Sequence, residues 1–153
     1  MKTFVYVLGE DKRGLKWHIM VKDYPVVSSR WLDFVPFIRL GTFSETEVKN
    51  NASPTEVAYV HPRSETEAFL VYIRVRKEYE DRGIGSLLIN LVERWEIERG
   101  VTKICGDISI KDKDHFDRLK HFYNKNGWTF ELFDKSKITP GSSSVGRVYK
   151  YLR

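Results

Sequence analysis

Residues 68–100 read AFLVYIRVRKEYEDRGIGSLLINLVERWEIERG, and this stretch decides the fold. Its first part, 68–75, is almost continuously apolar, which is typical of a buried central strand. Over 84–99 apolar side chains recur at helical spacing, which predicts an amphipathic helix whose charged side chains mostly face solvent. Gly100 follows where a helix C-cap belongs. The stretch therefore predicts a strand, a glycine-containing turn and a helix in direct succession.

The residues after this stretch continue the alternation of strand and helix. They predict a strand over 101–110, a helix over 115–125 capped by Asp114, and strands over 128–133 and 147–152. The order of elements indicates a mixed α/β or α+β fold.

The N-terminal part carries weaker signals. Short runs of β-branched and aromatic residues at 2–8 and 15–22, separated by GEDKRG, predict a hairpin. A helix is predicted over 27–40 and a short strand over 56–61.

Length and composition limit the class of protein. A chain of 153 residues fits one domain, so we expect 1–153 to form a single domain. No apolar run approaches the ~20 residues of a membrane span, so we expect no membrane partner and a cytoplasmic location. Cys105 is the only cysteine, which excludes an internal disulfide and a multi-cysteine zinc site. His115 and His121 lack the four-residue spacing of a helical metal pair, so we expect no metal.

The net charge of +5 suits an anionic ligand. The sequence holds no basic run of the kind that marks a nucleic-acid arm, and no helix-turn-helix or zinc pattern. These observations disfavour nucleic acid as a partner.

The turn between the first strand and helix is the strongest functional signal. Gly83 and Gly85 lead directly into the helix, where unpaired backbone N–H groups meet the positive end of the helix dipole and can hold a phosphate. Arg76, Lys77 and Arg82 add positive charge. The pattern lacks the Lys-Ser/Thr of a Walker A loop and the third glycine of a dinucleotide fingerprint. An ordinary turn is the alternative interpretation.

Two segments together resemble the GNAT superfamily of acetyl-CoA-dependent N-acetyltransferases over residues 68–153. The first, VRKEYEDRGIGSLL at 75–88, is similar to that family's V-x-P-x-Y-R-G-x-G-I-G-S-x-L-L, with Glu80 and Asp81 where Arg or Gln and Gly are common. The second, FYNKNGW at 122–128, is similar to its F/L-Y-x-K-x-G-F signature. Two signatures in this order are more specific than either alone.

The resemblance implies a central, mostly antiparallel twisted sheet of six to seven strands, flanked by helices and containing a splayed central strand pair. It implies that 1–67 forms the acceptor side and 68–153 the acetyl-CoA-binding half. The implied cofactor-binding residues are Ile73, Arg74 and Val75 for the pantetheine arm, the backbone amides of Arg82, Gly83, Ile84, Gly85 and Ser86 for the diphosphate, and Lys125 for the adenosine phosphates.

The resemblance also implies an enzyme that transfers the acetyl group of acetyl-CoA to a primary amine by direct attack in a ternary complex. Tyr123 stands at the family's general-acid position, and a backbone N–H near Val75 would stabilise the oxyanion. Glu67, at the start of the central strand, is the candidate general base, with a water chain as the alternative.

The acceptor is a small-molecule amine or a protein amine, and a homodimer is left open. A non-catalytic GNAT-like module that binds CoA or serves an interaction is the second hypothesis. A small basic nucleic-acid-binding protein is the third.

Overall fold

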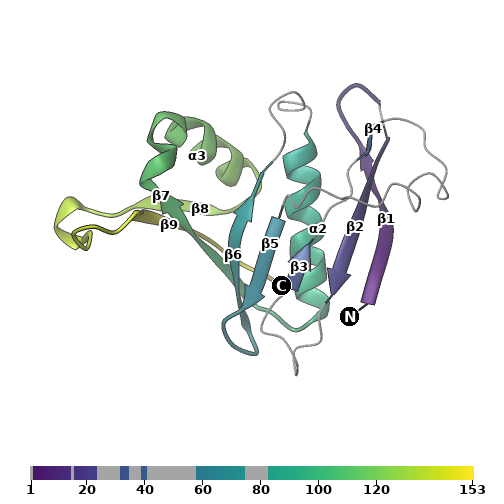
Figure 1. The fold of residues 1–153 in the computed structure, drawn as a ribbon, viewed down its shortest axis with the longest axis horizontal. Helices are drawn as coiled ribbons and strands as arrows, with labels where there is room; N and C mark the ends of the chain where they lie inside the picture. Colours follow the sequence, from purple (N-terminus) through teal and green to yellow (C-terminus); the bar gives the residue numbers. More distant parts are fainter. Residues whose placement is uncertain (1, 15, 24–31, 35–38, 41–57, 75–82) are drawn as a thin grey trace.

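The computed structural model of the chain describes residues 2–14, 16–23, 32–34, 39–40, 58–74 and 83–153 (Figure 1). Among these residues are nine strands: β1 (Lys2–Glu10), β2 (Lys16–Asp23), β3 (Leu32–Phe34), β4 (Arg39–Leu40), β5 (Ala58–Pro62), β6 (Glu67–Ile73), β7 (Lys103–Ser109), β8 (Thr129–Leu132) and β9 (Ser144–Tyr151). The same residues contain the α-helices α2 (Ile84–Glu98) and α3 (Phe116–Lys125), and the 3-10 helices η2 (Ile110–His115) and η3 (Lys135–Lys137).

The strands form one sheet in the order β1-β2-β3-β5-β6-β7-β9-β8, with β4 beside β2. β6 and β7 pair in parallel, and the other pairs in the described sheet are antiparallel. A mixed fold with a mostly antiparallel sheet is therefore confirmed. β3 and β4, only three and two residues long, bring the number of strands above the six to seven expected.

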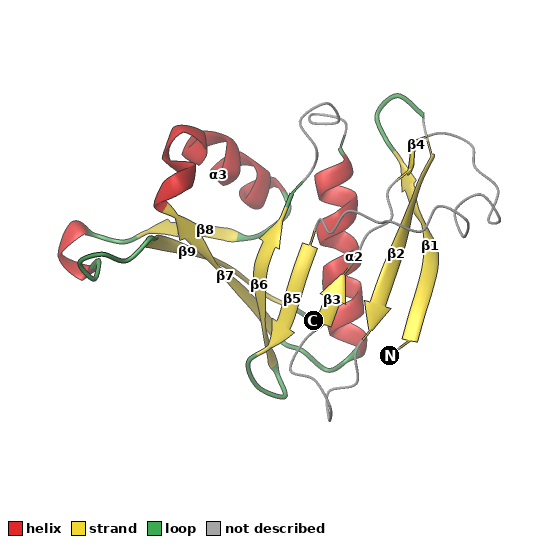
Figure 2. Cartoon of the chain, in the orientation of Figure 1, coloured by secondary structure: helices red, strands yellow, loops and turns green. Residues whose placement is uncertain are grey.

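The helix α2 lies in the chain between β6 and β7, because two parallel neighbouring strands need a crossover connection. It packs on one face of the sheet (Figure 2). Its buried Ile84, Leu88 and Val92 belong to one core cluster with Leu70 of β6 and Ile104 of β7. Each such side chain stabilises the fold by about 1.5–3 kcal/mol when fully buried.

The central strand β6 is buried on one face only. Ala68 and Leu70 are almost fully covered, whereas Val71 is 42% exposed. The apolar run thus does not form a strand buried on both faces, because some of its side chains lie on the face away from α2.

The helix predicted over 27–40 is wrong where the structure describes that segment, because Leu32–Phe34 is β3 and Arg39–Leu40 is β4. A helix over this window would lack the backbone donor of Pro36, and the proline ring would clash with the preceding turn. Pairing of β3 with β5 and of β4 with β2 supplies hydrogen bonds that the helix would have to provide. The remainder of that window lies outside the described residues.

The second predicted helix begins one residue later than expected. Ser109, not Asp114, acts as a cap: its hydroxyl accepts from the Lys111 N–H at 3.2 Å and starts η2, which leads into α3. Within the described ranges, no helix is long and apolar enough to cross a membrane.

Candidate active site

The amino-terminal end of α2 lies one connection after the central strand. β6 ends at Ile73, and the exposed Arg74 follows it. Gly83 is the N-cap of α2, with φ 84° and ψ 4°, a left-handed conformation that other residues rarely adopt. Glycine has no side chain to cap the helix, and the first turn holds no acidic residue. The unpaired N–H groups of this turn form the positive end of the helix dipole. No carboxylate in the turn neutralises that charge.

This helix end has the properties of an anion site. The amides of Ile84, Gly85 and Ser86 lie in the first turn, where no intrahelical carbonyl accepts from them. Lys12, in the turn after β1, is beside them: its Cγ and Cε lie 3.7 Å from the position of a Cβ on Gly83. Lys12 was missed by the sequence analysis because the N-terminal part showed no resemblance to the family.

Gly85 allows α3 to approach α2 closely. A Cβ on Gly85 would lie 2.9 Å from Cε1 of Phe122, closer than real Cβ contacts come. Contact with the Phe122 ring is therefore a reason for glycine here, and it places α3 against the start of α2.

Tyr123 lies in α3 between two other aromatic rings. The centroids of Phe122 and Trp128 are 5.2 and 5.7 Å from its own. Burial, with a smaller contribution from the charge of Asp112, raises the pKa of Tyr123 from its ordinary value of 10 to about 12. The phenol therefore keeps its proton at neutral pH and is able to donate a hydrogen bond.

The parallel strands β6 and β7 separate after a short paired region. They pair only over Glu67–Phe69 and Lys103–Cys105. Beyond that region β6 continues to Ile73 and β7 to Ser109, and Figure 1 shows the strands diverging toward their carboxyl ends. The predicted splayed pair is confirmed. The separated edge of β6 offers backbone groups with which an extended ligand could pair.

A β-bulge interrupts β6 within the separated region. Tyr59 of β5 pairs with Tyr72, and the next residue, Val60, pairs with Leu70. Val71 is thus the extra residue of the bulge. Bulges are frequent beside active sites, where they redirect backbone groups.

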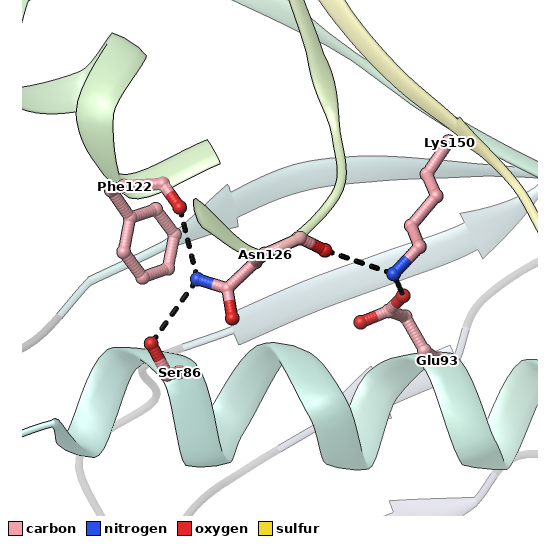
Figure 3. A network of polar contacts seen from close by, with 5 residues as sticks. All are labelled: Ser86, Glu93, Phe122, Asn126 and Lys150. Atoms are coloured by element: carbon pink, nitrogen blue, oxygen red, sulfur yellow. Dashed lines mark hydrogen bonds and ion pairs between the residues drawn. The ribbon is translucent and has the colours of Figure 1, made fainter. Parts of the chain in front are cut away.

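A polar network joins α2, α3 and β9 at this end of the molecule (Figure 3). The Asn126 side-chain nitrogen donates to the Ser86 hydroxyl at 3.1 Å and to the Phe122 carbonyl at 2.9 Å. Lys150 donates to the Asn126 carbonyl at 2.9 Å and forms an ion pair with Glu93. No local sequence pattern indicated this network, because Asn126 lies 40 residues from Ser86 and 24 residues from Lys150.

The prediction that the charged side chains of α2 mostly face solvent is wrong for two of them. Glu93 and Glu96 are 6% and 1% exposed. For Glu93 the reason is the ion pair with Lys150, which lies far along the chain and compensates the burial of the carboxylate.

The predicted site residues that remain lie in α3, outside the described residues, or in β6. Tyr123 follows Phe122, whose ring lies against Gly85 in the first turn of α2. Lys125 is the exposed last residue of α3. Val75 and Arg82 lie outside the described residues. Glu67 lies at the paired end of β6 and Ile73 at the other end, about 20 Å away at ~3.3 Å per residue.

The Glu67 carboxylate accepts from the Cys105 thiol at 3.3 Å. Burial, and then this hydrogen bond, raises the pKa of Cys105. The role of Glu67 as general base stays a prediction. Across the part of the chain that the structure describes, no cluster of three or more His, Cys, Asp or Glu side chains could hold a metal ion.

Comparison with known proteins adds independent information. A segment of 46 residues is 35% identical to an uncharacterized Bacillus subtilis protein, YocC; it covers 30% of this chain and 28% of that protein. The fold is similar to the GNAT domain of S. lividans PAT, with 14% identity and a TM-score of 0.54 over 98% of this chain and 97% of that one. It is also similar to a Bacillus subtilis acetyltransferase solved in complex with CoA, with 14% identity and a TM-score of 0.52 over 81% and 78% of the two chains.

At such identities these two structures show the fold alone. The sequence profile of the Acetyltransferase (GNAT) family, however, matches residues 36–128, which is more than half of the chain. The resemblance that the two signatures indicated is thereby confirmed, and the chain belongs to the GNAT family of acetyltransferases.

Proposed function

We propose that this chain transfers the acetyl group of acetyl-CoA to a primary amine, which attacks the thioester directly within a ternary complex. The observation that carries the proposal is the start of α2, whose first-turn amides lie next to the helix of Tyr123. Membership of the GNAT family supports it.

The substrate would lie along the edge of β6 and over the start of α2. The backbone of Ile73, Arg74 and Val75 would pair with the pantetheine arm. The amides of residues 82–86 would hold the diphosphate, and Lys125 the adenosine phosphates. Lys12 adds a positive charge to the same region.

The reaction forms a C–N bond and breaks a C–S bond. The neutral amine attacks the thioester carbonyl, and a backbone N–H near Val75 stabilises the oxyanion. Collapse of the intermediate expels the CoA thiolate, which takes a proton from Tyr123, while the former amine gives up the proton that restores the phenol.

The pKa of Tyr123 decides how this proton moves. A thiol has a pKa of about 8.5, by analogy with cysteine, and Tyr123 has one of about 12. A free tyrosinate would therefore cost about 5 kcal/mol relative to the thiolate, at 1.36 kcal/mol per pKa unit. Tyr123 thus acts as a hydrogen-bond donor that passes its proton only as it receives another.

Release of free thiol from acetyl-CoA in the presence of a panel of small amines and amine-bearing peptides tests the proposal. We expect thiol release with at least one acceptor, and a rise in Tm with acetyl-CoA. Tyr123→Phe should lower kcat about 10²-fold with little change in the Kd for CoA. Tyr149→Phe is the matched control, because it removes the same hydroxyl from β9. Equal kcat values for the two variants would remove Tyr123 from the acid role.

A second candidate function is a CoA-binding module without catalysis. It is favoured by the Glu67 carboxylate, which accepts from the Cys105 thiol at the opposite end of β6 from Ile73. Binding of CoA without thiol release from any acceptor would support this candidate. The nature of the amine, a homodimer and a cytoplasmic location stay predictions.

A further inference from the structure

The side-chain amide of Asn126 lies between the two parts of the proposed site. Its nitrogen is 3.1 Å from the Ser86 hydroxyl oxygen in the first turn of α2. The same nitrogen is 2.9 Å from the Phe122 carbonyl oxygen in α3, next to Tyr123. One NH2 group thus spans both helices (Figure 3).

The Phe122 carbonyl determines which end of the amide faces Ser86. A carbonyl oxygen only accepts hydrogen bonds, so the atom facing it must be the amide nitrogen and not the amide oxygen. That nitrogen has two hydrogens, one for Phe122 and one for Ser86. The Ser86 oxygen must therefore accept from Asn126, and the single hydroxyl hydrogen of Ser86 is left for another acceptor.

Asn126 is itself held in place from two sides. Its backbone carbonyl accepts from Lys150 at 2.9 Å, and Lys150 is paired with the buried Glu93 of α2. Its backbone N–H donates to the Tyr123 carbonyl at 3.2 Å. These contacts hold the backbone of Asn126, and the hydrogen bond to the Phe122 carbonyl orients its side-chain amide.

We propose that Asn126 is a positioning residue that makes the Ser86 hydroxyl an obligate donor to the diphosphate of acetyl-CoA. The inference rests on the proposed function. Ser86 lies in the first turn of α2, beside amides that have no intrahelical acceptor. A hydroxyl that accepts from Asn126 presents its hydrogen to the same anion as those amides. A hydrogen bond to a charged group of this kind improves affinity by about tenfold or more.

Reversing the hydrogen-bond polarity tests the inference. In Asn126→Asp the carboxylate has no hydrogen to donate, so the Ser86 hydroxyl turns toward it and is lost to the diphosphate. Isothermal titration with CoA should give a Kd about tenfold or more higher than that of wild type. In Asn126→Ala the Ser86 hydroxyl stays free to donate, and we expect the Kd to rise by no more than about threefold.

A thermodynamic cycle separates this polarity from simple charge repulsion. Ser86→Ala should raise the Kd about tenfold, and adding Asn126→Asp to it should raise the Kd little further. Asn124→Asp is the matched control: it places the same charge on an exposed residue of α3, and it should leave the Kd within about threefold of wild type. Circular dichroism and Tm establish that each variant is folded. If Asn126→Asp does not fold, the comparison of Asn126→Ala with Ser86→Ala decides: a Kd raised by Ser86→Ala alone supports the inference, and equal losses overturn it.

The outcomes distinguish the two proposals. Wild type that binds no CoA at millimolar concentration overturns the proposed function and this inference with it. Wild type that binds CoA, with Asn126→Asp equally harmful in the Ser86→Ala background, overturns the inference alone. The same holds if Asn126→Ala weakens binding as much as Ser86→Ala, since a structural link between the helices would then explain both.

Discussion

Replacing Lys150 by methionine tests whether a buried ion pair holds α2 to β9. The Glu93 side chain is 8% exposed and that of Lys150 is 28% exposed. Removing the ammonium leaves a buried carboxylate without its counter-charge, and breaking a fully buried pair costs about 3–5 kcal/mol. Because Lys150 is partly exposed, we expect a loss of about 2–4 kcal/mol in the free energy of unfolding. At about 2–4 °C per kcal/mol, Tm should fall by about 4–16 °C.

Thermal unfolding followed by circular dichroism measures this loss, and β9 offers a matched control. Arg147 and Glu131 form a pair at 3.5 Å with side chains 50% and 45% exposed, so Arg147→Met should cost at most about 1 kcal/mol. Adding Glu93→Leu to Lys150→Met removes the unpaired carboxylate and should recover much of the loss. The reasoning is refuted if Lys150→Met is as stable as Arg147→Met, or if the double variant is no more stable than Lys150→Met.

Three further predictions concern the same region. Gly85→Ala places a Cβ 2.9 Å from Phe122, so overpacking should lower the free energy of unfolding by about 1–3 kcal/mol and thiol release about tenfold or more. Adding Phe122→Leu should partly restore both. Unchanged turnover in Gly85→Ala would contradict this prediction. The pKa of Tyr123 is about 12 in the folded protein against 10 in the unfolded chain. Its contribution to the free energy of unfolding, up to about 2.7 kcal/mol, is therefore present below pH 10 and is lost as pH rises toward 12. Measured by denaturant unfolding, Tyr123→Phe should lose less stability than wild type between pH 10 and 12. Gly83→Ala, at φ 84° with ordinary contacts around it, should lower stability by about 1–2 kcal/mol, as should Gly14→Ala at φ 78° with nothing nearby; a much larger loss at Gly83 would show that contacts and not backbone strain determine the cost.

Local patterns were sufficient where hydrophobic periodicity and glycine coincide. The helix predicted over 84–99 is α2, Ile84–Glu98, and Gly100 follows it with φ 86°. The strand predicted over 101–110 is β7, Lys103–Ser109. In both cases the signal lies within the segment itself.

Tertiary pairing determined the elements that sequence patterns mistook. The window 27–40 has helical spacing of apolar residues, but Leu32 pairs with Val60 and becomes part of a sheet. Similarly, Glu93 is charged and was expected on the solvent side, but Lys150 lies opposite it and allows its burial. Neither partner can be identified from the neighbouring sequence.

By itself, the amino-acid sequence determined the family, the central strand and the helix α2, because each depends on residues close together in the chain. Only the tertiary structure decided that Asn126 lies against Ser86, 40 residues away, and that Glu67 lies at the paired end of β6. The physical reason is that these contacts depend on how helices and strands pack across the sheet, and packing brings together residues whose separation along the chain carries no signal of their proximity in space.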